Sequence, residues 1–167
     1  GDWIISSAPA VAEGKVYVGS FDRRVYCLDA LTGAFIWSYT ATEQVESSPA
    51  VAGGKVYFSS RDNSVFCLDA LTGAFIWSYA TGGPLGSGLL ESSPAVADGK
   101  VYVGSLDDKV YCLDALTGAH IWNYTTGWDV YSSPAVADGK VYVGSNDDKV
   151  YCLNASTGEH VWNYTTG

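Results

Sequence analysis

The sequence predicts an all-β fold, a propeller with four blades in this chain, and three observations support that prediction. One unit recurs over residues 1–46, 47–91, 92–131 and 132–167, a period near 40 residues. Short runs such as K-V-Y-V-G-S and K-V-Y-C-L are rich in β-branched and aromatic residues, as strands are. Turn residues separate these runs at short intervals, so each unit is expected to hold four antiparallel strands rather than two helices.

A two-residue hairpin joins the first and second strands of each unit. Type I′ turns need positive φ at both central residues, and Gly, Asn and Asp adopt it most readily. Apolar residues occur at both odd and even positions of a strand, so both faces of the sheet carry them. This pattern predicts sheets covered on both faces, as in blades stacked around an axis. In the second unit we expect strands at 45–52, 55–60, 64–69 and 74–79. The central turn residues are Glu13-Gly14, Gly53-Gly54, Asp98-Gly99 and Asp138-Gly139.

The turn before the fourth strand carries the most specific motif. It is L-D-A-L-T-G-A-F-I-W at 28–37 and 68–77, LDALTGAHIW in the third unit and LNASTGEHVW in the fourth. This motif resembles the tryptophan-docking repeat of pyrroloquinoline-quinone-like β-propellers, the fold of quinoprotein alcohol dehydrogenases and of an outer-membrane-assembly scaffold lipoprotein. The resemblance implies that each turn holds a tryptophan between neighbouring blades. The docking residues it implies are Trp37, Trp77, Trp122, Trp162, Asp29, Asp69, Asp114, Asn154, Gly33, Gly73, Gly118 and Gly158.

The resemblance also implies redox chemistry that this sequence does not match. The family's dehydrogenases hold a quinone beside a disulfide of adjacent cysteines, with Ca²⁺ bound by Asp, Glu and Asn. Nucleotide-binding and Ser-His-Asp motifs are absent from the sequence. We therefore expect no enzyme activity, no cofactor and no metal site. The cysteines stand one per unit, spaced by 40, 45 and 40 residues, which suits neither an adjacent pair nor a zinc site: Cys27, Cys67, Cys112 and Cys152.

Two further features have a plain structural interpretation. His120 and His160 replace a phenylalanine of the first two units, so packing is favoured over metal binding. The acidic pairs at 107–108 and 147–148 lie in turns between strands, and we expect solvated side chains there rather than a Ca²⁺ loop.

Comparison of the units separates constant turns from variable ones. The loops between the second and third strands differ (SFDRRV, SRDNSV, SLDDKV, SNDDKV), and the connections TATEQVE, ATGGPLGSGLLE and TTGWDVY differ most. In an up-and-down blade both kinds of loop lie on the same face. A specific partner would be expected to bind there, because recognition residues commonly lie on loops. Random sequence change in surface loops that bind nothing gives the same pattern. A Gly-rich insertion at 81–90 lengthens this face. The candidate binding residues are Phe21, Arg23, Arg24, Arg61, Asn63, Leu106, Asn146 and Trp128.

The two end blades each expose an apolar face that needs a neighbour. They could meet each other in a four-bladed ring, or meet a second chain in an eight-bladed ring, since propellers have typically four to eight blades. The resembled family usually has seven or eight blades, which favours the homodimer. The chain could also be a piece of a longer array.

Charge and hydropathy restrict the partners. Nine Lys and Arg against 18 Asp and Glu give a net charge of −9, which predicts no binding to nucleic acid. No apolar run approaches the roughly 18 residues of a membrane span. Because the chain begins at Gly1 without methionine, any signal segment is expected to be missing from it. We expect an extracytoplasmic prokaryotic protein.

The function most consistent with these features is a non-enzymatic structural or protein-interaction scaffold. Nearly identical units also fit a recently amplified or engineered repeat, for which no evolved ligand need exist. The alternatives are a fragment of a quinoprotein-like dehydrogenase, and a propeller that binds glycans at exposed aromatics such as Trp128.

Overall fold

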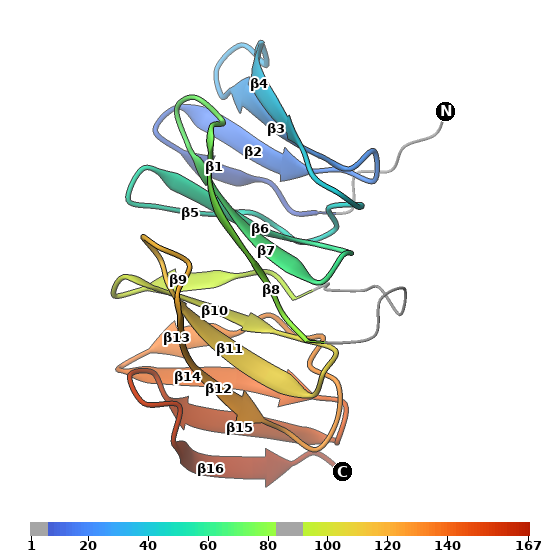
Figure 1. Ribbon diagram of the computed structural model, residues 1–167, viewed down its shortest axis with the longest axis vertical. Helices are drawn as coiled ribbons and strands as arrows, with labels where there is room; N and C mark the ends of the chain where they lie inside the picture. Colours follow the sequence, from blue (N-terminus) through green and yellow to red (C-terminus); the bar gives the residue numbers. More distant parts are fainter. Residues whose placement is uncertain (1–6, 83–91) are drawn as a thin grey trace.

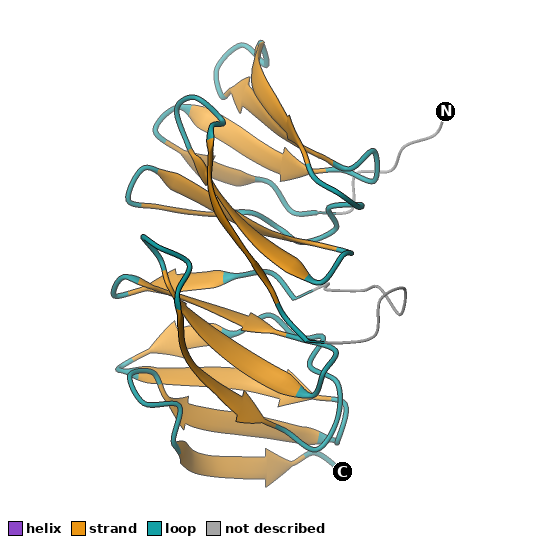
Figure 2. Cartoon of the chain, viewed as in Figure 1, coloured by secondary structure: helices purple, strands orange, loops and turns teal. Residues whose placement is uncertain are grey.

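The computed structural model describes residues 7–82 and 92–167, and within them sixteen strands form four separate antiparallel sheets (Figures 1 and 2). Each sheet has four strands in sequence order, so each is an up-and-down blade. The all-β prediction is confirmed. Most of the Gly-rich insertion at 81–90, from residue 83 onward, lies outside the described residues.

The blades follow one another along the chain and are numbered in that order. Blade 1 contains β1 (Ala10–Ala12), β2 (Lys15–Gly19), β3 (Arg24–Asp29) and β4 (Phe35–Thr40). Blade 2 contains β5 (Ala50–Ala52), β6 (Lys55–Ser60), β7 (Ser64–Asp69) and β8 (Phe75–Ala80). Blade 3 contains β9 (Ala95–Ala97), β10 (Lys100–Gly104), β11 (Lys109–Asp114) and β12 (His120–Thr125). Blade 4 contains β13 (Ala135–Ala137), β14 (Lys140–Ser145), β15 (Lys149–Asn154) and β16 (His160–Thr165).

The innermost strands are shorter than the sequence predicts. In blade 2 the strand expected at 45–52 is reduced to Ala50–Ala52. The segment before it pairs through side chains, because Ser47 Oγ both accepts from the Ser59 amide and donates to its carbonyl. The Ser48 amide donates to Ser93 Oγ of the next blade instead of to β6. The outer strand, Phe75–Ala80, is displaced by one residue from the expected 74–79.

The first hairpin of each blade has the predicted backbone. Both central residues have positive φ in all four blades, with 50° and 70° at Glu13 and Gly14 and 56° and 69° at Gly53 and Gly54. These values match a type I′ turn, whose twist suits the flanking strands. The hairpin therefore fixes the register, in which Ala12 pairs with Lys15 and Ala52 with Lys55.

The apolar core lies between the blades rather than within them. Three clusters of buried side chains occupy the joints between blades 1 and 2, 2 and 3, and 3 and 4. Consecutive residues of β7 and β11 are buried, because both faces of these sheets are covered, whereas every residue of β16 is exposed.

The blades form an open arc. The innermost strands of consecutive blades contact one another, and blades 1 and 4 lie at opposite ends of the molecule (Figure 1). The hairpins between first and second and between third and fourth strands lie at one edge, and the remaining loops lie at the other (Figure 2). Among the described residues, no helix has the length and apolarity that crossing a membrane requires.

Candidate functional site

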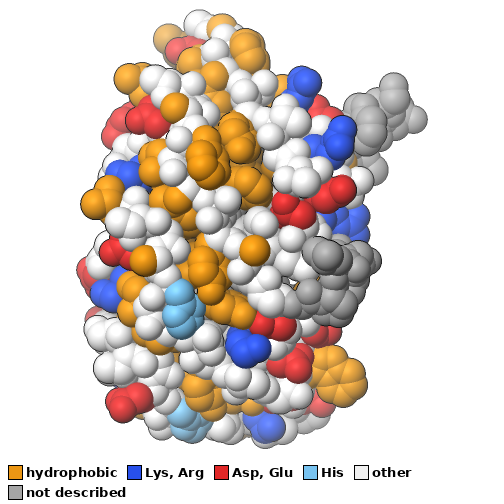
Figure 3. All heavy atoms as spheres, viewed as in Figure 1, with side chains coloured by type: hydrophobic (Ala, Val, Ile, Leu, Met, Phe, Trp, Pro, Cys, Tyr) orange, Lys and Arg blue, Asp and Glu red, His pale blue; other side chains and the backbone are white. Residues whose placement is uncertain are grey.

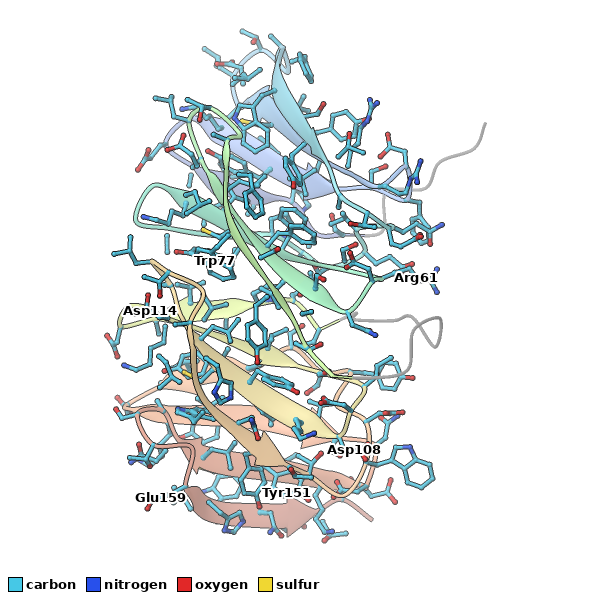
Figure 4. All side chains as sticks on the ribbon, viewed as in Figure 1. Arg61, Trp77, Asp108, Asp114, Tyr151 and Glu159 are labelled. Carbon is cyan, nitrogen blue, oxygen red and sulfur yellow. The ribbon has the colours of Figure 1, made fainter. Side chains whose placement is uncertain are left out.

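One tryptophan from the outer strand of a blade docks on the next blade at each joint. Trp37 is buried between blades 1 and 2, and its indole N–H donates to the carbonyl of Ala70 at 3.3 Å. The ring lies against Gly73, where an added Cβ would come within 2.7 Å of it, so only glycine leaves room. The same contacts recur for Trp77 with Ala115 and Gly118, and for Trp122 with Ala155 and Gly158. Figure 4 shows Trp77 beside the turn of blade 3 that contains Asp114.

A tyrosine from the second strand binds the same carbonyl. Tyr17 donates to Ala70 at 3.0 Å, so this oxygen accepts hydrogen bonds from both the phenol and the Trp37 indole. Burial is the main cause that raises the pKa of Tyr17 to about 12, and the phenol therefore stays a neutral donor. Tyr57 and Tyr102 make the equivalent bonds at 3.0 and 3.1 Å.

A row of stacked rings crosses the outer face of the joints. Tyr39 stacks on Phe75 at a centroid distance of 6.4 Å, and Tyr79 stacks on His120 at 6.2 Å. The stack of Tyr124 on His160, at 6.1 Å, continues the row. The histidines therefore pack as the phenylalanine does, and Figure 3 shows them on the same face as the apolar side chains of the outer strands.

The docking turns are held by a carboxylate. Asp69 Oδ1 accepts from the Leu71 and Thr72 amides and from the Thr72 hydroxyl, at 2.8 to 3.0 Å. The Thr72 hydroxyl contributes most to lowering the pKa of this carboxyl, which keeps it ionised as an acceptor. Asp29 and Asp114 make the same bonds, whereas Asn154 accepts only from two backbone amides.

Within residues 7–82 and 92–167, the fourth docking tryptophan has no following blade to dock on. Trp162 is 42% exposed, compared with 7% or 8% for the other three. At the other end of the arc, the docking turn of blade 1 (residues 30–35) receives no tryptophan from the described residues, since a Cβ at Gly33 would meet no heavy atom within 4 Å. The part of a blade that receives the tryptophan of its neighbour is called the seat below. The described arc therefore has an undocked tryptophan in blade 4 and an unfilled seat in blade 1.

The loops that vary between units gather at one edge, as predicted for an up-and-down blade (Figure 2). Figure 4 places Arg61 and Asp108 at this edge, opposite Asp114 and Glu159. Trp128 is 61% exposed, and Arg23, Arg24 and Asn146 are exposed as well. Phe21 and Arg61 are half-buried, and Arg61 pairs with Glu46 at 3.1 Å.

Two predicted binding residues are buried, so we remove them from the candidate surface. Asn63 is 3% exposed. It takes φ of 63° in a tight turn, and its carbonyl accepts from the Thr81 amide and hydroxyl. Leu106, at the start of the corresponding turn of blade 3, is 7% exposed. Sequence variation alone could not separate such turn residues from exposed ones.

Two connections between blades, one before β5 and one before β13, have the same backbone hydrogen bonds although their side chains differ. The Glu43 carbonyl accepts from the Ser60 hydroxyl, and the Trp128 carbonyl accepts from the Ser145 hydroxyl. The next carbonyl along each connection accepts from the backbone amide of Arg61 at 3.0 Å and of Asn146 at 2.9 Å. Glutamate and tryptophan therefore occupy the same place on a fixed backbone.

The sequence reasoning missed an aspartate–tyrosine pair in these turns. Asp107 was expected to be solvated, but its carboxylate accepts from Tyr111 at 2.5 Å and pairs with Lys109 at 3.1 Å. Burial opposes ionisation of Asp107, and hydrogen bonds from Tyr111, Ser105 and Lys109 outweigh it, so the pKa is lowered. Asp147 likewise accepts from Tyr151, and the signal was an Asp four residues before a Tyr.

The described cysteines do not fit the quinone site of the resembled dehydrogenases. Each is buried in the third strand of a different blade, so none has an adjacent cysteine. Burial is the main cause that raises the pKa of Cys67 and Cys112 to about 12. Within residues 7–82 and 92–167 no three His, Cys, Asp or Glu side chains gather as metal ligands. We derive no redox step from these residues.

One cavity opens between blades 2 and 3 at the edge with the constant hairpins. It measures about 480 Å³, and its walls include Lys55, Tyr57, Val96 and Leu116. Its walls also include Gly53, which stands at the repeat position of Glu13 in blade 1.

The chain is similar to known propeller proteins over its whole length. The family model described as outer membrane protein assembly factor BamB matches residues 2–95 and 80–167. BamB from Moraxella catarrhalis has a TM-score of 0.74 and 22% identity, over 96% of this chain and 62% of that chain. The quinohemoprotein alcohol dehydrogenase ADHIIG from Pseudomonas putida HK5 has a TM-score of 0.86 and 23% identity, over 99% of this chain and 34% of that chain.

A third solved structure extends the comparison. The quinohemoprotein alcohol dehydrogenase from Comamonas testosteroni has a TM-score of 0.83 and 21% identity, over 97% of this chain and 35% of that chain. At these identities the likeness concerns the fold alone. The chain spans between 34% and 62% of the length of these three proteins. No curated protein sequence matches it.

Proposed function

This chain belongs to the PQQ-like repeat family of the BamB type, and from that premise we propose that it is a non-enzymatic scaffold that recognises partners with its variable-loop edge. The proposal takes the blades as rigid support and the loops as the part that contacts other molecules. Loops on a rigid scaffold are where recognition residues commonly lie.

The observation that carries this proposal is the pair of equivalent connections between blades. Glu43 and Trp128 share the same backbone hydrogen bonds, although one side chain is anionic and the other is a large aromatic. A fixed backbone that accepts different side chains lets binding chemistry change without loss of the fold. Trp128 leaves 61% of its surface exposed, so most of this large aromatic side chain is available to a partner.

The arc is proposed to be one half of the working molecule. Two copies would give eight blades, within the range of known propellers. The unfilled seat at Gly33 and the exposed Trp162 support this arrangement. The matched family's description, an outer membrane protein assembly factor, supports a place outside the cytoplasm of a prokaryote, and the charge of −9 disfavours nucleic acid as a partner.

Binding arrays test the recognition role. The chain is screened against a glycan array and an array of short acidic and basic peptides, and each hit is measured again with Trp128→Ala and Arg24→Ala. Leu71→Ser, on an exposed turn at the opposite edge, is the control. We expect a hit that weakens at least tenfold in a variant of the variable edge and persists in the control. The absence of hits, or hits that only the control loses, would contradict the proposal.

A glycan is the second candidate partner, and the geometry of Trp128 favours it. The Trp128 carbonyl accepts from the Thr126 and Ser145 hydroxyls, at 2.6 and 2.9 Å, so the exposed ring stands on a held backbone. A flat indole beside polar groups suits a sugar face. The same glycan array decides this point, because only a glycan hit lost in Trp128→Ala supports it.

The dehydrogenase alternative has a direct assay. Purified protein is mixed with pyrroloquinoline quinone, Ca²⁺, a primary alcohol and an artificial electron acceptor. Reduction of the acceptor above the level without protein would replace the scaffold proposal with an enzyme. No reduction is expected, because the cysteines lie apart in four blades.

A further inference from the structure

We infer that a second copy of this chain docks on blade 4 by placing its blade 1 turn over Trp162, and that the second copy does the same in return. The inference rests on the proposed ring and names the side chains that make its joints. It is drawn from three internal joints that repeat one set of contacts.

Each internal joint has a donor side and a seat. The donor side consists of an indole, a phenol from the second strand and a tyrosine ring at the end of the outer strand. In the joint of blades 2 and 3 these are Trp77, Tyr57 and Tyr79. The seat is on the next blade, where an alanine carbonyl accepts twice, a glycine faces the indole and an aromatic ring stacks on the tyrosine. Here the seat is Ala115, Gly118 and His120.

Blade 4 presents a complete donor side that no other described blade covers. Its members are Trp162, Tyr142 and Tyr164, at the repeat positions of the internal donors. Trp162 is 42% exposed, whereas the three internal tryptophans are 7% or 8% exposed. Tyr142 is half-buried, whereas its counterparts Tyr17, Tyr57 and Tyr102 are at most 2% exposed, and Tyr164 is 68% exposed. Tyr142 and Trp162 already contact each other with a centroid distance of 6.0 Å, as in the internal joints, so the donor side is preformed.

Blade 1 presents a complete seat that no other blade fills among residues 7–82 and 92–167. Its members are Ala30, Gly33 and Phe35. Ala30 is exposed, whereas the alanines of the internal seats are 4% to 7% exposed. Phe35 is 63% exposed, and the turn is held by Asp29 in the same way as the occupied turns. Because the backbone of the empty seat matches that of the filled ones, docking requires no rearrangement.

A polar contact at the loop edge completes the match. In the joint of blades 3 and 4 the Gly127 amide donates to Asp147 Oδ2 at 3.0 Å. Gly167 ends blade 4 at the position of Gly127, and Asp22 stands in blade 1 at the position of Asp147. The same amide-to-carboxylate bond is therefore available between copies.

The positions of the donor side and the seat determine the type of contact between copies. The donor side and the seat lie at opposite ends of the arc, so a contact between copies is head to tail (Figure 1). Head-to-tail contacts close into a ring when the rotation allows it, and otherwise they form open chains. Four blades from each of two copies close an eight-bladed ring with two identical joints.

Solution mass and three variants test the inference. We expect sedimentation equilibrium of the wild type to give twice 17.7 kDa. Trp162→Ala removes the indole from the donor side, and Ala30→Arg places a long charged side chain in the seat. Each variant alone is expected to raise the dissociation constant of the dimer at least a hundredfold while the circular dichroism of the chain is retained. Leu71→Ser changes an exposed turn of blade 2, outside the joint between copies, and is expected to leave the dissociation constant unchanged.

Mixing the two variants gives the sharpest readout. Trp162→Ala keeps an intact seat and Ala30→Arg keeps an intact donor side, so an equimolar mixture can form a heterodimer through one intact joint. We expect the mixture to associate more tightly than either variant alone, which an isologous contact would not produce.

The results of these measurements distinguish the inferred contact between copies from the proposed closed ring. A strictly monomeric wild type overturns both the ring and the joint. A dimer that Trp162→Ala and Ala30→Arg leave intact overturns the joint and keeps a two-copy assembly. An open polymer that Trp162→Ala dissolves supports the joint and overturns ring closure.

Discussion

The indole nitrogen of Trp77 lies 3.2 Å from the carbonyl oxygen of Ala115, thirty-eight residues further along the chain. This hydrogen bond ties the outer strand of blade 2 to the docking turn of blade 3. The same oxygen accepts from Tyr57 at 3.0 Å, so one carbonyl holds two aromatic side chains in the joint. The core of this protein consists of such joints, because the buried clusters lie between blades.

Loss of a docked indole should weaken the whole arc. Trp77→Ala removes a ring that is 7% exposed and leaves its space between blades 2 and 3 empty. We expect the free energy of unfolding to fall by about 3–5 kcal/mol, the usual cost of truncating a buried aromatic. Urea denaturation followed by circular dichroism measures it. Trp128→Ala, at an exposed indole, is the control and should change stability by less than about 0.5 kcal/mol. Equal effects of the two variants would contradict the docking role.

Glycine in the docking turn should be required for space as well as for backbone geometry. Gly118 and Gly99 have φ of 72° and 71°, so alanine strains the backbone similarly at both positions. A Cβ at Gly118 would come within 2.6 Å of the Trp77 ring, whereas at Gly99 it would meet nothing within 4 Å. Gly118→Ala should therefore cost about 1–3 kcal/mol more than Gly99→Ala, which is the range for overpacking. Thermal or urea unfolding of both variants gives the difference, and equal costs would show that the Trp77 contact is unimportant.

The turn carboxylate Asp107 should make stability depend on pH in acid. Its pKa is lowered in the folded state, because hydrogen bonds from Tyr111, Ser105 and Lys109 outweigh the effect of burial. A lowered folded pKa gives stability that is present above the unfolded pKa, about 3.9, and lost as the pH falls through the folded value. We expect Asp107→Asn to flatten the decline of unfolding free energy below about pH 4. Urea unfolding from pH 2 to 7 measures this, with Asp98→Asn, at the exposed hairpin turn, as the control.

Local sequence was enough to predict the strands and hairpins of each blade. Asp98-Gly99 specifies a type I′ turn whatever surrounds it, and the observed φ values of 48° and 71° agree. Repetition of one motif in four units also predicted the shared edge of the variable loops. These features depend on neighbours in sequence, which the repeat displays four times.

Features that depend on the next blade could not be predicted from one unit. The Ser48 amide, in the segment expected to belong to the innermost strand of blade 2, donates instead to Ser93 Oγ across a joint. Asn63 is buried, whereas Arg23, at the same repeat position and with a similar φ, is exposed, so the local turn alone does not set the burial of this residue. The Asp107–Tyr111 pair needs a partly buried turn to hold the carboxylate, and that burial is set by packing between blades.

The inferred joint between copies lacks a serine hydroxyl that each internal joint has. Inside the arc, a backbone amide of each blade donates to a serine Oγ of the next: Ala8 to Ser48 at 2.9 Å, Ser48 to Ser93 at 2.8 Å, and Ser93 to Ser133 at 2.9 Å. In the inferred ring the Ser133 amide would face residue 8 of the second copy. That residue is alanine, which has no acceptor, so this joint would lack a bond that every internal joint has.

Ala8→Ser should therefore tighten the dimer. One added hydrogen bond contributes about 1 kcal/mol, and a ring has two such joints, so the gain is about 2 kcal/mol. The dissociation constant should fall roughly thirtyfold, since about 1.4 kcal/mol is tenfold. Ala8→Val adds a side chain of similar size without an acceptor and is the control. Sedimentation equilibrium of both variants measures the constants. If serine and valine have equal effects, the Ser133 amide does not face residue 8 of a second copy, and the head-to-tail register inferred above is wrong.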